Sequence, residues 1–512
     1  MIMERKENRL TFRVSALLIC VLSAISCQKE QDKNYFYTYI QSDPGKLDPF
    51  YSTDVVSGRI LTKICNGLFK IDNNGIIKRD LIDSFTFNGK ILKAKLKRNV
   101  HFHNGLALNS DDVIFSYERI KNSKNPTSPR RWIFNNIKTI AKRGEHEFSI
   151  KLKRPSSTFL SLLTMPNCYI ISKNEFLKHR NIIGSGPFIL KTWGQDEKIV
   201  LEANQNYFGR RSKIKGIVFK IIPEDLTARF EFLNGALDYF ELPYLANIDY
   251  VKNAHFNKNA RIIEIPELSV HYIALNTSRY PFNKKVFRKA LNMAIDRDMI
   301  MKSLLKNRFQ RASGPIPPRI GDYVTTTDSI PYNPSKARKI IKQFTLNNKR
   351  FTLFTKSDHQ VSLISQMVQY YLKKMDLNIG IQEMDWSALK AATIKGSYDL
   401  AYFTWHADYP EPENFLYPLF FSKNSGTGGN RSFYFNEEVD RLLIMAQRTI
   451  DNSKRFKIYN KIERIIIDDA PWIFLWYGDK RIAITKRITQ FVPYPIYCGF
   501  KGNEISIASK TE

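Results

Sequence analysis

The sequence predicts a protein of mixed α/β class with more than one domain. Short strand-like runs alternate with helix-like segments along most of the 512 residues, a pattern typical of mixed α/β folds. A chain of this length with 43% hydrophobic residues can bury two or three cores. The 25% of charged residues argues against a membrane bundle or a disordered chain. No apolar run reaches the 18 residues that a spanning helix needs.

The first 26 residues have the pattern of a targeting segment. Four basic residues precede an apolar run from Val14 to Ile25, which is too short to span a bilayer but has the length of a signal-peptide core. Small residues then precede Cys27, as a lipoprotein signal peptidase requires. We expect residues 1–26 to be a lipoprotein signal peptide, Cys27 to be lipidated (palmitate), and residues 27–34 to form a tether. An ordinary signal peptide with a chance cysteine is the alternative.

The net charge is strongly positive. It is +30 for the whole chain and about +28 once residues 1–26, with four basic and two acidic residues, are removed. Lys and Arg are spread along the chain, and export separates it from nucleic acid, so we expect no nucleic-acid partner. Electrostatic attachment to an anionic membrane stays open. Cys65, Cys168 and Cys498 would remain in the mature chain, so at most one disulfide can form among them.

The elements follow from local periodicity. Tyr35 to Ile40 reads as a strand, Leu92 to Phe102 as a strand pair, and Asp111 to Ile120 as a helix with Ser110 as N-cap. Val286 to Leu305 reads as a single amphipathic helix. Further helices are expected at Leu226–Leu233, Ser335–Phe344, Ser362–Met375, Glu437–Ala446 and Ser453–Ile467. Further strands are expected at Ile199–Leu201, Ile217–Ile222, Phe351–Phe354, Tyr398–Thr404, Ile473–Trp476 and Ile482–Ile484.

The sequence lacks the common catalytic signatures, among them GxSxG, HExxH, Walker and GxGxxG motifs. His101 and His103 share a face of a predicted strand, but no third metal ligand accompanies them. We therefore expect neither an enzyme nor a metal or cofactor site. The segment from Trp405 to Pro412 is acidic, aromatic and bounded by prolines, and it directly follows a predicted strand. Loops in that position line ligand clefts in α/β proteins.

Nine short motifs, in order, resemble the bacterial extracellular solute-binding proteins of the dipeptide, oligopeptide and nickel group (family 5). They are Leu47-Asp48-Pro49, Asn66-Gly67-Leu68, Lys95 to Gly105 with Asp111-Asp112-Val113, Gly184-Ser185-Gly186-Pro187-Phe188, Asn204 to Tyr207, Pro281-Phe282-Asn283 with Arg288-Lys289-Ala290, Ala294-Ile295-Asp296-Arg297, Asn333-Pro334 with Lys336-Ala337, and Tyr398-Asp399 with Trp405 to Tyr409. The resemblance covers nearly the whole mature chain.

The resemblance implies a two-lobed periplasmic-binding-protein-like fold of type II with an additional family-specific domain. We expect lobe I from residues 35–66, 184–265 and 487–512, the additional domain from residues 67–183, and lobe II from residues 266–486. The lobes would close on an oligopeptide in the cleft between them. The chain would be a periplasmic, membrane-anchored monomer that hands peptides to the permease subunits of an ABC importer.

The resemblance also suggests ligand-binding residues. In peptide binders of the family, the acid of a W-x-x-D motif pairs with the α-ammonium group of the peptide, and Asp408 stands at that position. This is physically sound, because a buried cation needs an ionised partner. Trp405 and Trp386 match pocket tryptophans, His406 lies inside the motif, and Tyr477 falls near a tyrosine-rich stretch that lines the cleft.

Recognition of the ligand's carboxylate is less well supported. Related peptide binders often place an arginine three residues before the motif tryptophan, where this chain has Tyr402. His359 falls near a histidine that serves the same purpose. Ligand length therefore stays open. So do two alternatives: a receptor of the same fold for a nickel chelate, a sugar or a cell-wall peptide, and a surface adhesin built on this scaffold.

Overall fold

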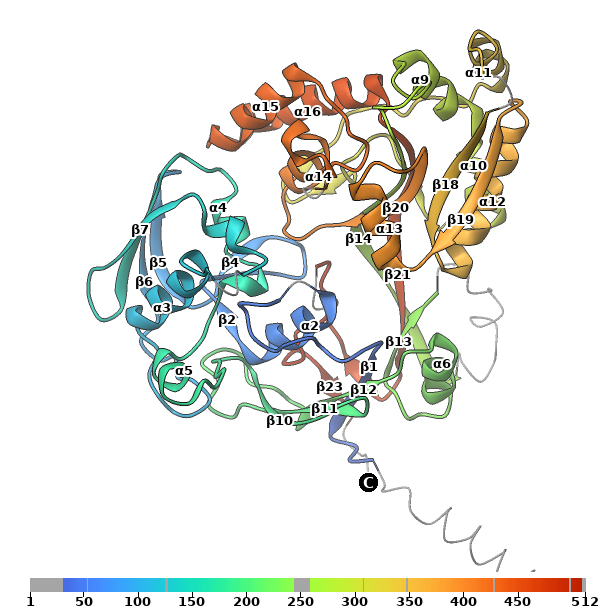
Figure 1. Ribbon diagram of the computed structural model, residues 1–512. Helices are drawn as coiled ribbons and strands as arrows, with labels where there is room; N and C mark the ends of the chain where they lie inside the picture. Colours follow the sequence, from blue (N-terminus) through green and yellow to red (C-terminus); the bar gives the residue numbers. More distant parts are fainter. Residues whose placement is uncertain are drawn as a thin grey trace, which may run out of the picture.

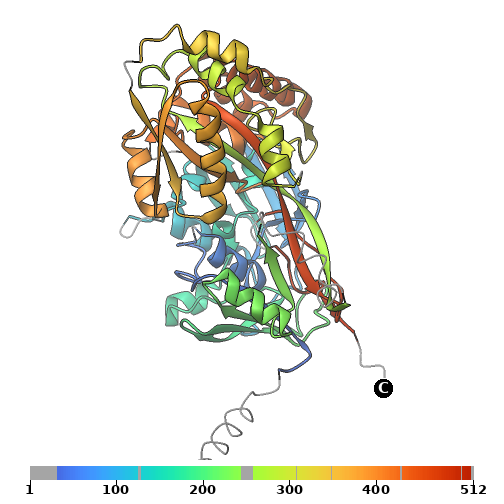
Figure 2. The same ribbon diagram turned by 90° about the vertical axis from the view of Figure 1, so that its right-hand side faces the viewer.

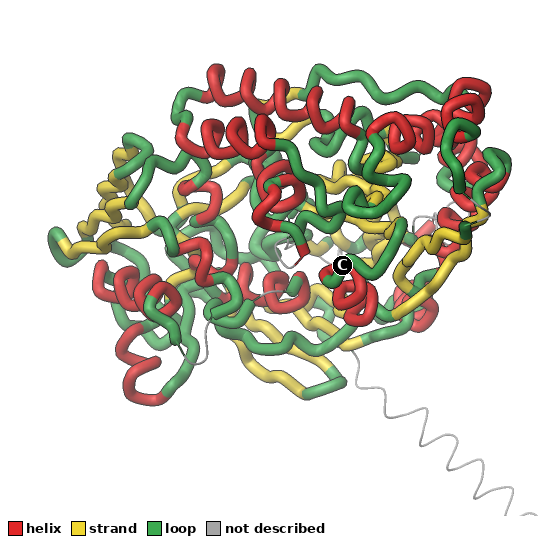
Figure 3. Tube along the Cα trace, turned by 45° about the horizontal axis from the view of Figure 1, so that its top comes forward, coloured by secondary structure: helices red, strands yellow, loops and turns green. Residues whose placement is uncertain are grey.

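The computed structural model describes residues 31–52, 54–124, 128–243, 258–306, 308–346, 349–426, 429–496 and 499–508. Helices and strands occur together throughout the molecule (Figure 3), which confirms the mixed α/β class. The predicted signal segment, Cys27 and Cys498 lie outside the described residues. Within the described ranges no helix is both long enough and apolar enough to cross a membrane.

The first lobe is built on a four-stranded sheet of order β1-β12-β11-β10, at the bottom of Figure 1. Only the β1–β12 pair is parallel. Every residue of β1 is buried, which explains its run of aromatic side chains. The strands and the accompanying helices are β1 (Tyr35–Ile40), β10 (Phe188–Gly194), β11 (Lys198–Ala203), β12 (Gly216–Ile221), α2 (Val55–Ile64) and α6 (Asp225–Leu233).

Two glycines of the Gly184-Ser185-Gly186 motif are required by close packing against the end of α2. A Cβ atom on Gly184 would come within 2.1 Å of the Ile64 carbonyl oxygen, and one on Gly186 within 2.3 Å of the Lys63 carbonyl oxygen. The backbone of the helix end cannot move away cheaply, so only glycine fits at these positions.

The additional domain contains an antiparallel sheet of order β5-β6-β8-β7 covered by α3 (Ser110–Lys121). The helix begins one residue earlier than expected, because Asn109 rather than Ser110 caps it, with Asp112 completing a capping box. The other elements are β2 (Asn66–Gly67), β3 (Phe69–Ile71), β4 (Ile77–Arg79), β5 (Ile82–Phe87), β6 (Ile91–Leu96), β7 (Ile137–Lys142), β8 (Glu147–Leu152), β9 (Tyr169–Ile170), α4 (Phe159–Leu162), α5 (Lys173–His179), and the 3-10 turns η1 (Arg131–Phe134) and η2 (Pro166–Cys168).

The larger sheet has the path β13-β21-β14-β20-β18-β19 and forms the second lobe, except that β13 packs against the core of the first lobe. Its strands are β13 (Tyr239–Leu242), β14 (Ala260–Leu275), β18 (Arg350–Lys356), β19 (Asn378–Met384), β20 (Leu400–His406) and β21 (Trp472–Thr485), with β15 (Gln310–Arg311) beside β21. Its helices are α9 (Lys285–Ala294), α10 (Arg297–Ser303), α11 (Pro334–Ile341), α12 (His359–Lys373), α13 (Trp386–Ile394), α14 (Glu413–Phe420), α15 (Glu437–Arg448) and α16 (Asn452–Asp469). Short pieces complete the fold: β16 (Arg319–Ile320), β17 (Tyr323–Val324), η3 (Ser422–Asn424), β22 (Ile488–Gln490) and β23 (Ser506–Ile507).

Two sequence expectations are wrong in this lobe. The predicted helix from Val286 to Leu305 is two helices, because the Asp296 side chain accepts a hydrogen bond from the Met299 N–H and caps α10. The two strands expected at Ile473–Trp476 and Ile482–Ile484 are one strand, β21. The polar residues between them continue the ladder because β14 pairs along both halves, with a bulge between Pro266 and Val270.

The long strands β14 and β21 connect the two lobes, as Figure 2 shows. Ile265 and Ile482 belong to the hydrophobic core of the first lobe. Ile273 and Ile473, farther along the same strands, belong to the core of the second lobe. The additional domain has a third core around Leu92 and Val113. The domain boundaries given above stay a prediction.

Candidate ligand-binding cleft

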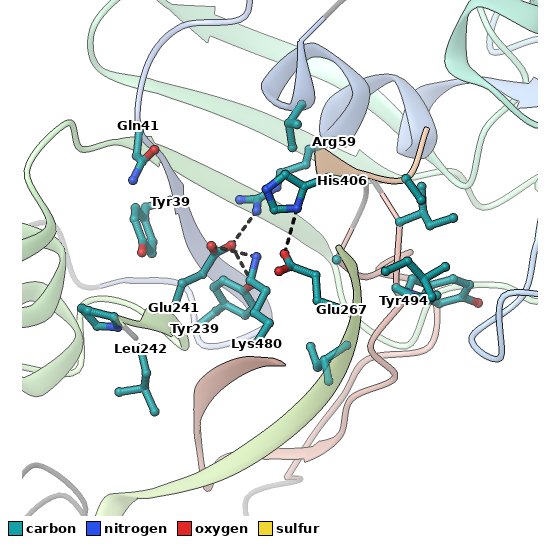
Figure 4. A pocket seen from close by; sticks show the side chains of 18 of the residues that line it. Tyr39, Gln41, Arg59, Tyr239, Glu241, Leu242, Glu267, His406, Lys480 and Tyr494 are labelled. Atoms are coloured by element: carbon teal, nitrogen blue, oxygen red, sulfur yellow. Dashed lines mark hydrogen bonds and ion pairs between the residues drawn. The ribbon is translucent and has the colours of Figure 1, made fainter. Parts of the chain in front are cut away.

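A pocket of about 360 Å³ lies between the lobes. Side chains of the first lobe, of the connecting strands and of the loop after β20 line it (Figure 4). Its polar lining includes Tyr39, Arg59, Asp225, Tyr239, Glu241, Glu267, Gln360, His406, Asp408, Lys480 and Tyr494. The volume is at the lower end of the range for small-molecule sites.

Asp408 lies in this pocket, on the loop that leaves β20. Its backbone N–H donates to Asn414 Oδ1 at 3.0 Å, and the Trp405 indole N–H donates to the same oxygen at 3.2 Å. One amide at the start of α14 therefore holds both residues of the W-x-x-D motif. The Asp408 carboxylate faces Arg130 of the additional domain, with 3.5 Å between Oδ2 and Nη1, and the two side chains are 21% and 22% exposed.

His406 and Glu267 form an ion pair across neighbouring strands. His406 pairs in register with Ser269, so Glu267 lies diagonally across on the same face, with 3.3 Å between His406 Nδ1 and Glu267 Oε1. Burial lowers the pKa of His406, but the Glu267 carboxylate outweighs this and leaves the pKa raised. Burial raises the pKa of Glu267, but His406, Lys480 and a hydrogen bond from Ser269 together lower it.

A second charged cluster lies on the first-lobe side of the pocket. Glu241 accepts from Arg59 Nη2 at 2.6 Å and from the Tyr239 hydroxyl at 2.9 Å, and Lys480 Nζ is 2.8 Å from its other oxygen. Burial raises the pKa of Glu241, but Arg59 and Lys480 outweigh it and lower the pKa to about 2. Residues 59, 241 and 480 meet here because α2 lies close to β13, which pairs with β21.

The predicted ligand residues do not all lie at the pocket. Only His406 and Asp408 line the pocket. Trp405 is partly buried against the second core. Trp386, at the start of α13, is 47% exposed and contacts Phe403 edge-on. His359 is exposed at the first turn of α12, beside the pocket residue Gln360.

Tyr402 and Tyr477 are buried inside the second lobe. The Tyr402 hydroxyl lies 2.8 Å from His271 Nδ1. The Tyr477 hydroxyl accepts from the Gly314 N–H at 3.1 Å. Neither side chain lines the pocket.

Sequence reasoning missed Arg59, Glu241, Glu267 and Lys480. The available signal was weak: Glu241 is a charged residue within an otherwise apolar strand segment, whereas Lys480 lies in a polar stretch between Asp479 and Arg481. Such residues need a partner, but the sequence gives no way to choose the partner.

The cysteines and histidines outside the pocket do not form a metal site in the described part of the chain. Cys65 and Cys168 are buried free thiols. His103 Nε2 lies 3.0 Å from the Gly186 carbonyl oxygen, and His101 forms an isolated bridge with Ala107. Among the described residues there is no group of three or more His, Cys, Asp or Glu side chains suited to a metal ion.

Comparisons with known proteins identify a family model and several similar proteins. The model of bacterial extracellular solute-binding proteins, family 5, matches residues 78–427. The probable D,D-dipeptide-binding periplasmic protein DdpA of Escherichia coli is 27% identical over 474 residues, covering 89% of this chain and 90% of that protein. The oligopeptide-binding protein AppA of Bacillus subtilis is 29% identical, covering 88% of each chain.

A solved structure of a related binding protein has the same fold. The periplasmic binding protein DppA of Helicobacter pylori, in complex with the peptide STSA, superposes with a TM-score of 0.81 and 25% identity. The match covers 93% of this chain and 98% of that one. The predicted fold, of type II with two lobes and an additional domain, is therefore confirmed, and the relatives are binding proteins of transport systems rather than enzymes. The chain belongs to the bacterial extracellular solute-binding proteins, family 5.

Proposed function

We propose that this chain is an exported, lipid-anchored receptor that binds short peptides in the inter-lobe pocket and delivers them to an ABC importer. Family membership supports the transport role, since relatives are named as dipeptide- or oligopeptide-binding proteins. The short apolar run ending at Cys27 supports export and the lipid anchor.

The observation that carries the peptide proposal is the position of Asp408. It lines the pocket, it is mostly buried, and it lies beside a cationic group, the Arg130 guanidinium. A partly desolvated carboxylate in a cleft gains from a charged hydrogen-bond donor. The α-ammonium group of a peptide supplies such a donor, so we assign it to Asp408 and regard Arg130 as the counter-ion that the ligand replaces.

The other predicted residues have different parts in this proposal. Trp386 and His359 are accessible, so both could approach the ligand when the lobes close, as hinged receptors do. Tyr402 and Tyr477 are buried in the second lobe and would act through the residues that they hold. Trp405 shares its Asn414 partner with Asp408, and so would position the anchor.

The experiment starts from the ligand that the protein itself retains. The mature protein is purified, denatured, and its released ligand identified by mass spectrometry. That peptide and its N-acetylated form are then titrated calorimetrically into wild type and Asp408→Asn. A buried charge that loses its partner costs about 3–5 kcal/mol, which is two to four decades of affinity.

We expect wild type to prefer the free amine strongly and Asp408→Asn not to prefer it. Asp376→Asn is the matched control, because Asp376 is an exposed acid paired with Arg338 at 2.8 Å and has a left-handed backbone (φ 63°) that asparagine adopts readily. A non-peptide released ligand, or equal binding of both peptide forms by wild type, would refute the proposal.

A further inference from the structure

The first-lobe side of the pocket has more hydrogen-bond donors than acceptors. Glu241 is fully engaged, since it takes Arg59, Lys480 and the Tyr239 hydroxyl. Arg59 carries five N–H donors, yet within the described residues its side chain donates only to Glu241, and its buried Nε has no hydrogen-bond partner. The Lys480 ammonium has three donors, and Glu241 is its only ion-pair partner in the described part of the chain.

The neighbouring acids do not use up this excess. Glu267 is occupied by His406 and Ser269. Asp225, at the start of α6, accepts from the Gln41 amide at 3.3 Å. Of the four carboxylates that line the pocket, Asp408 lies on the loop after β20 and Asp225 beside Gln41, while Glu241 and Glu267 are paired with Arg59, Lys480 and, when it is protonated, His406. An anionic oxygen that entered here would meet donors that face the pocket from two elements.

Two of the predicted ligand residues do not line this pocket. Tyr402 is buried against His271. His359 does not line the pocket. The Lys and Arg side chains that do line the pocket, in the described part of the chain, are Arg59 and Lys480.

We propose that Arg59 and Lys480 form the subsite for the carboxylate terminus of the ligand. This inference rests on the proposed function and specifies its ligand: a short peptide with both termini free. Its ammonium group would meet Asp408 on the second-lobe side and its carboxylate would meet Arg59 and Lys480 on the opposite side. A ligand held from both sides bridges the cleft, and it stabilises the closed form by its extra contacts there.

The two cations of the subsite come from different elements of the fold and are both mostly shielded from water. Lys480 lies on the strand β21 that connects the lobes, diagonally across from Glu241 of the neighbouring strand β13. Arg59 comes from α2, which begins with Asp54 as its N-cap. Their side chains are only 23% and 18% exposed, so a charged hydrogen bond to either is largely shielded from water. Glu241 pairs with both cations and holds them in place.

The test is a competition between two tripeptide libraries of the same composition, one with free carboxylates and the other with C-terminal amides. Both are offered together to the ligand-free mature protein, and retained peptides are quantified by mass spectrometry. We expect wild type to retain free acids over amides by about 30-fold or more, as for truncation of a buried charged pair. Lys480→Gln should reduce this ratio at least about tenfold. Lys142→Gln removes another ion-paired lysine, more exposed than Lys480 and 2.6 Å from Asp111 in the additional domain, and should leave the ratio unchanged.

Each other result counts against the subsite in a distinct way. Equal retention of acids and amides by wild type overturns the carboxylate subsite while peptide binding stands. An undiminished ratio in folded Lys480→Gln overturns the assignment to Lys480. Retention of neither library overturns the proposed function as well. If a variant fails to fold, the wild-type ratio still decides, and Arg59→Gln provides a second variant.

Discussion

Replacing Arg130 by glutamine should strengthen peptide binding. Arg130 reaches Asp408 from the additional domain with 3.5 Å between Nη1 and Oδ2, so a ligand ammonium must displace it or share the carboxylate with it. In either case, removal of the guanidinium leaves Asp408 with more negative potential for the ligand. Most mutations in a binding site weaken ligand binding, whereas we expect this one to strengthen it.

The magnitude follows from the geometry of this pair. At 3.5 Å and an effective dielectric constant of about 20, the bare attraction is about 5 kcal/mol. Desolvation and side-chain ordering remove most of it, and exposed pairs retain only about 0.2–1 kcal/mol. With both side chains about one-fifth exposed, we take the upper end, about 1 kcal/mol. Arg130→Gln should therefore raise the affinity for a peptide with a free amine about fivefold.

Calorimetry with the retained peptide and its N-acetylated form measures this effect. The gain should appear for the free amine and be absent for the acetylated peptide, since the latter brings no charge to Asp408. Lys142→Gln lowers the net charge of the same domain by one and controls for long-range electrostatics. Unchanged or weaker binding of the free amine by Arg130→Gln would refute this reasoning: unchanged binding would mean that Arg130 does not compete for Asp408, and weaker binding that Arg130 contacts the ligand favourably.

Two further predictions concern stability and the anchor. Burial raises the pKa of Glu463 from 4.5 to about 7, against hydrogen bonds from Tyr323 and Thr325 that lower it. The stability given by the neutral carboxyl is therefore fully present below about pH 4.5 and lost as the pH rises to about 7. Glu463→Gln should gain up to about 3 kcal/mol at pH 8 and nothing at pH 4.5, measured by denaturant unfolding; an equal gain at both pH values would contradict this. Cys27→Ser should abolish incorporation of radiolabelled palmitate while export continues, and labelling of the variant would show that the anchor lies elsewhere.

Local patterns in the sequence determined more of the fold than of the site. Buried apolar periodicity identified α12, α15, α16 and β18, because each pattern reflects one face against a core. It failed where contacts between distant segments overrule local signals. The sequence predicted two separate strands at Ile473–Trp476 and Ile482–Ile484, yet β14 pairs along the polar residues between them and makes them one strand, β21. The apolar stripe of 286–305 hid the helix start at Asp296, because periodicity does not register a cap.

The same distinction applies to the pocket. The sequence by itself determined the fold class, the order of the family motifs, and the segment that brings His406 and Asp408 to the pocket, since these depend on neighbouring residues. Only the tertiary structure decided which cations meet which acids there. Arg59, Glu241 and Lys480 are joined by the packing of α2 near β13 and the pairing of β13 with β21, and Arg130 reaches Asp408 across 278 residues. Electrostatic partners are chosen by distance in space, which the spacing of residues along a chain does not encode.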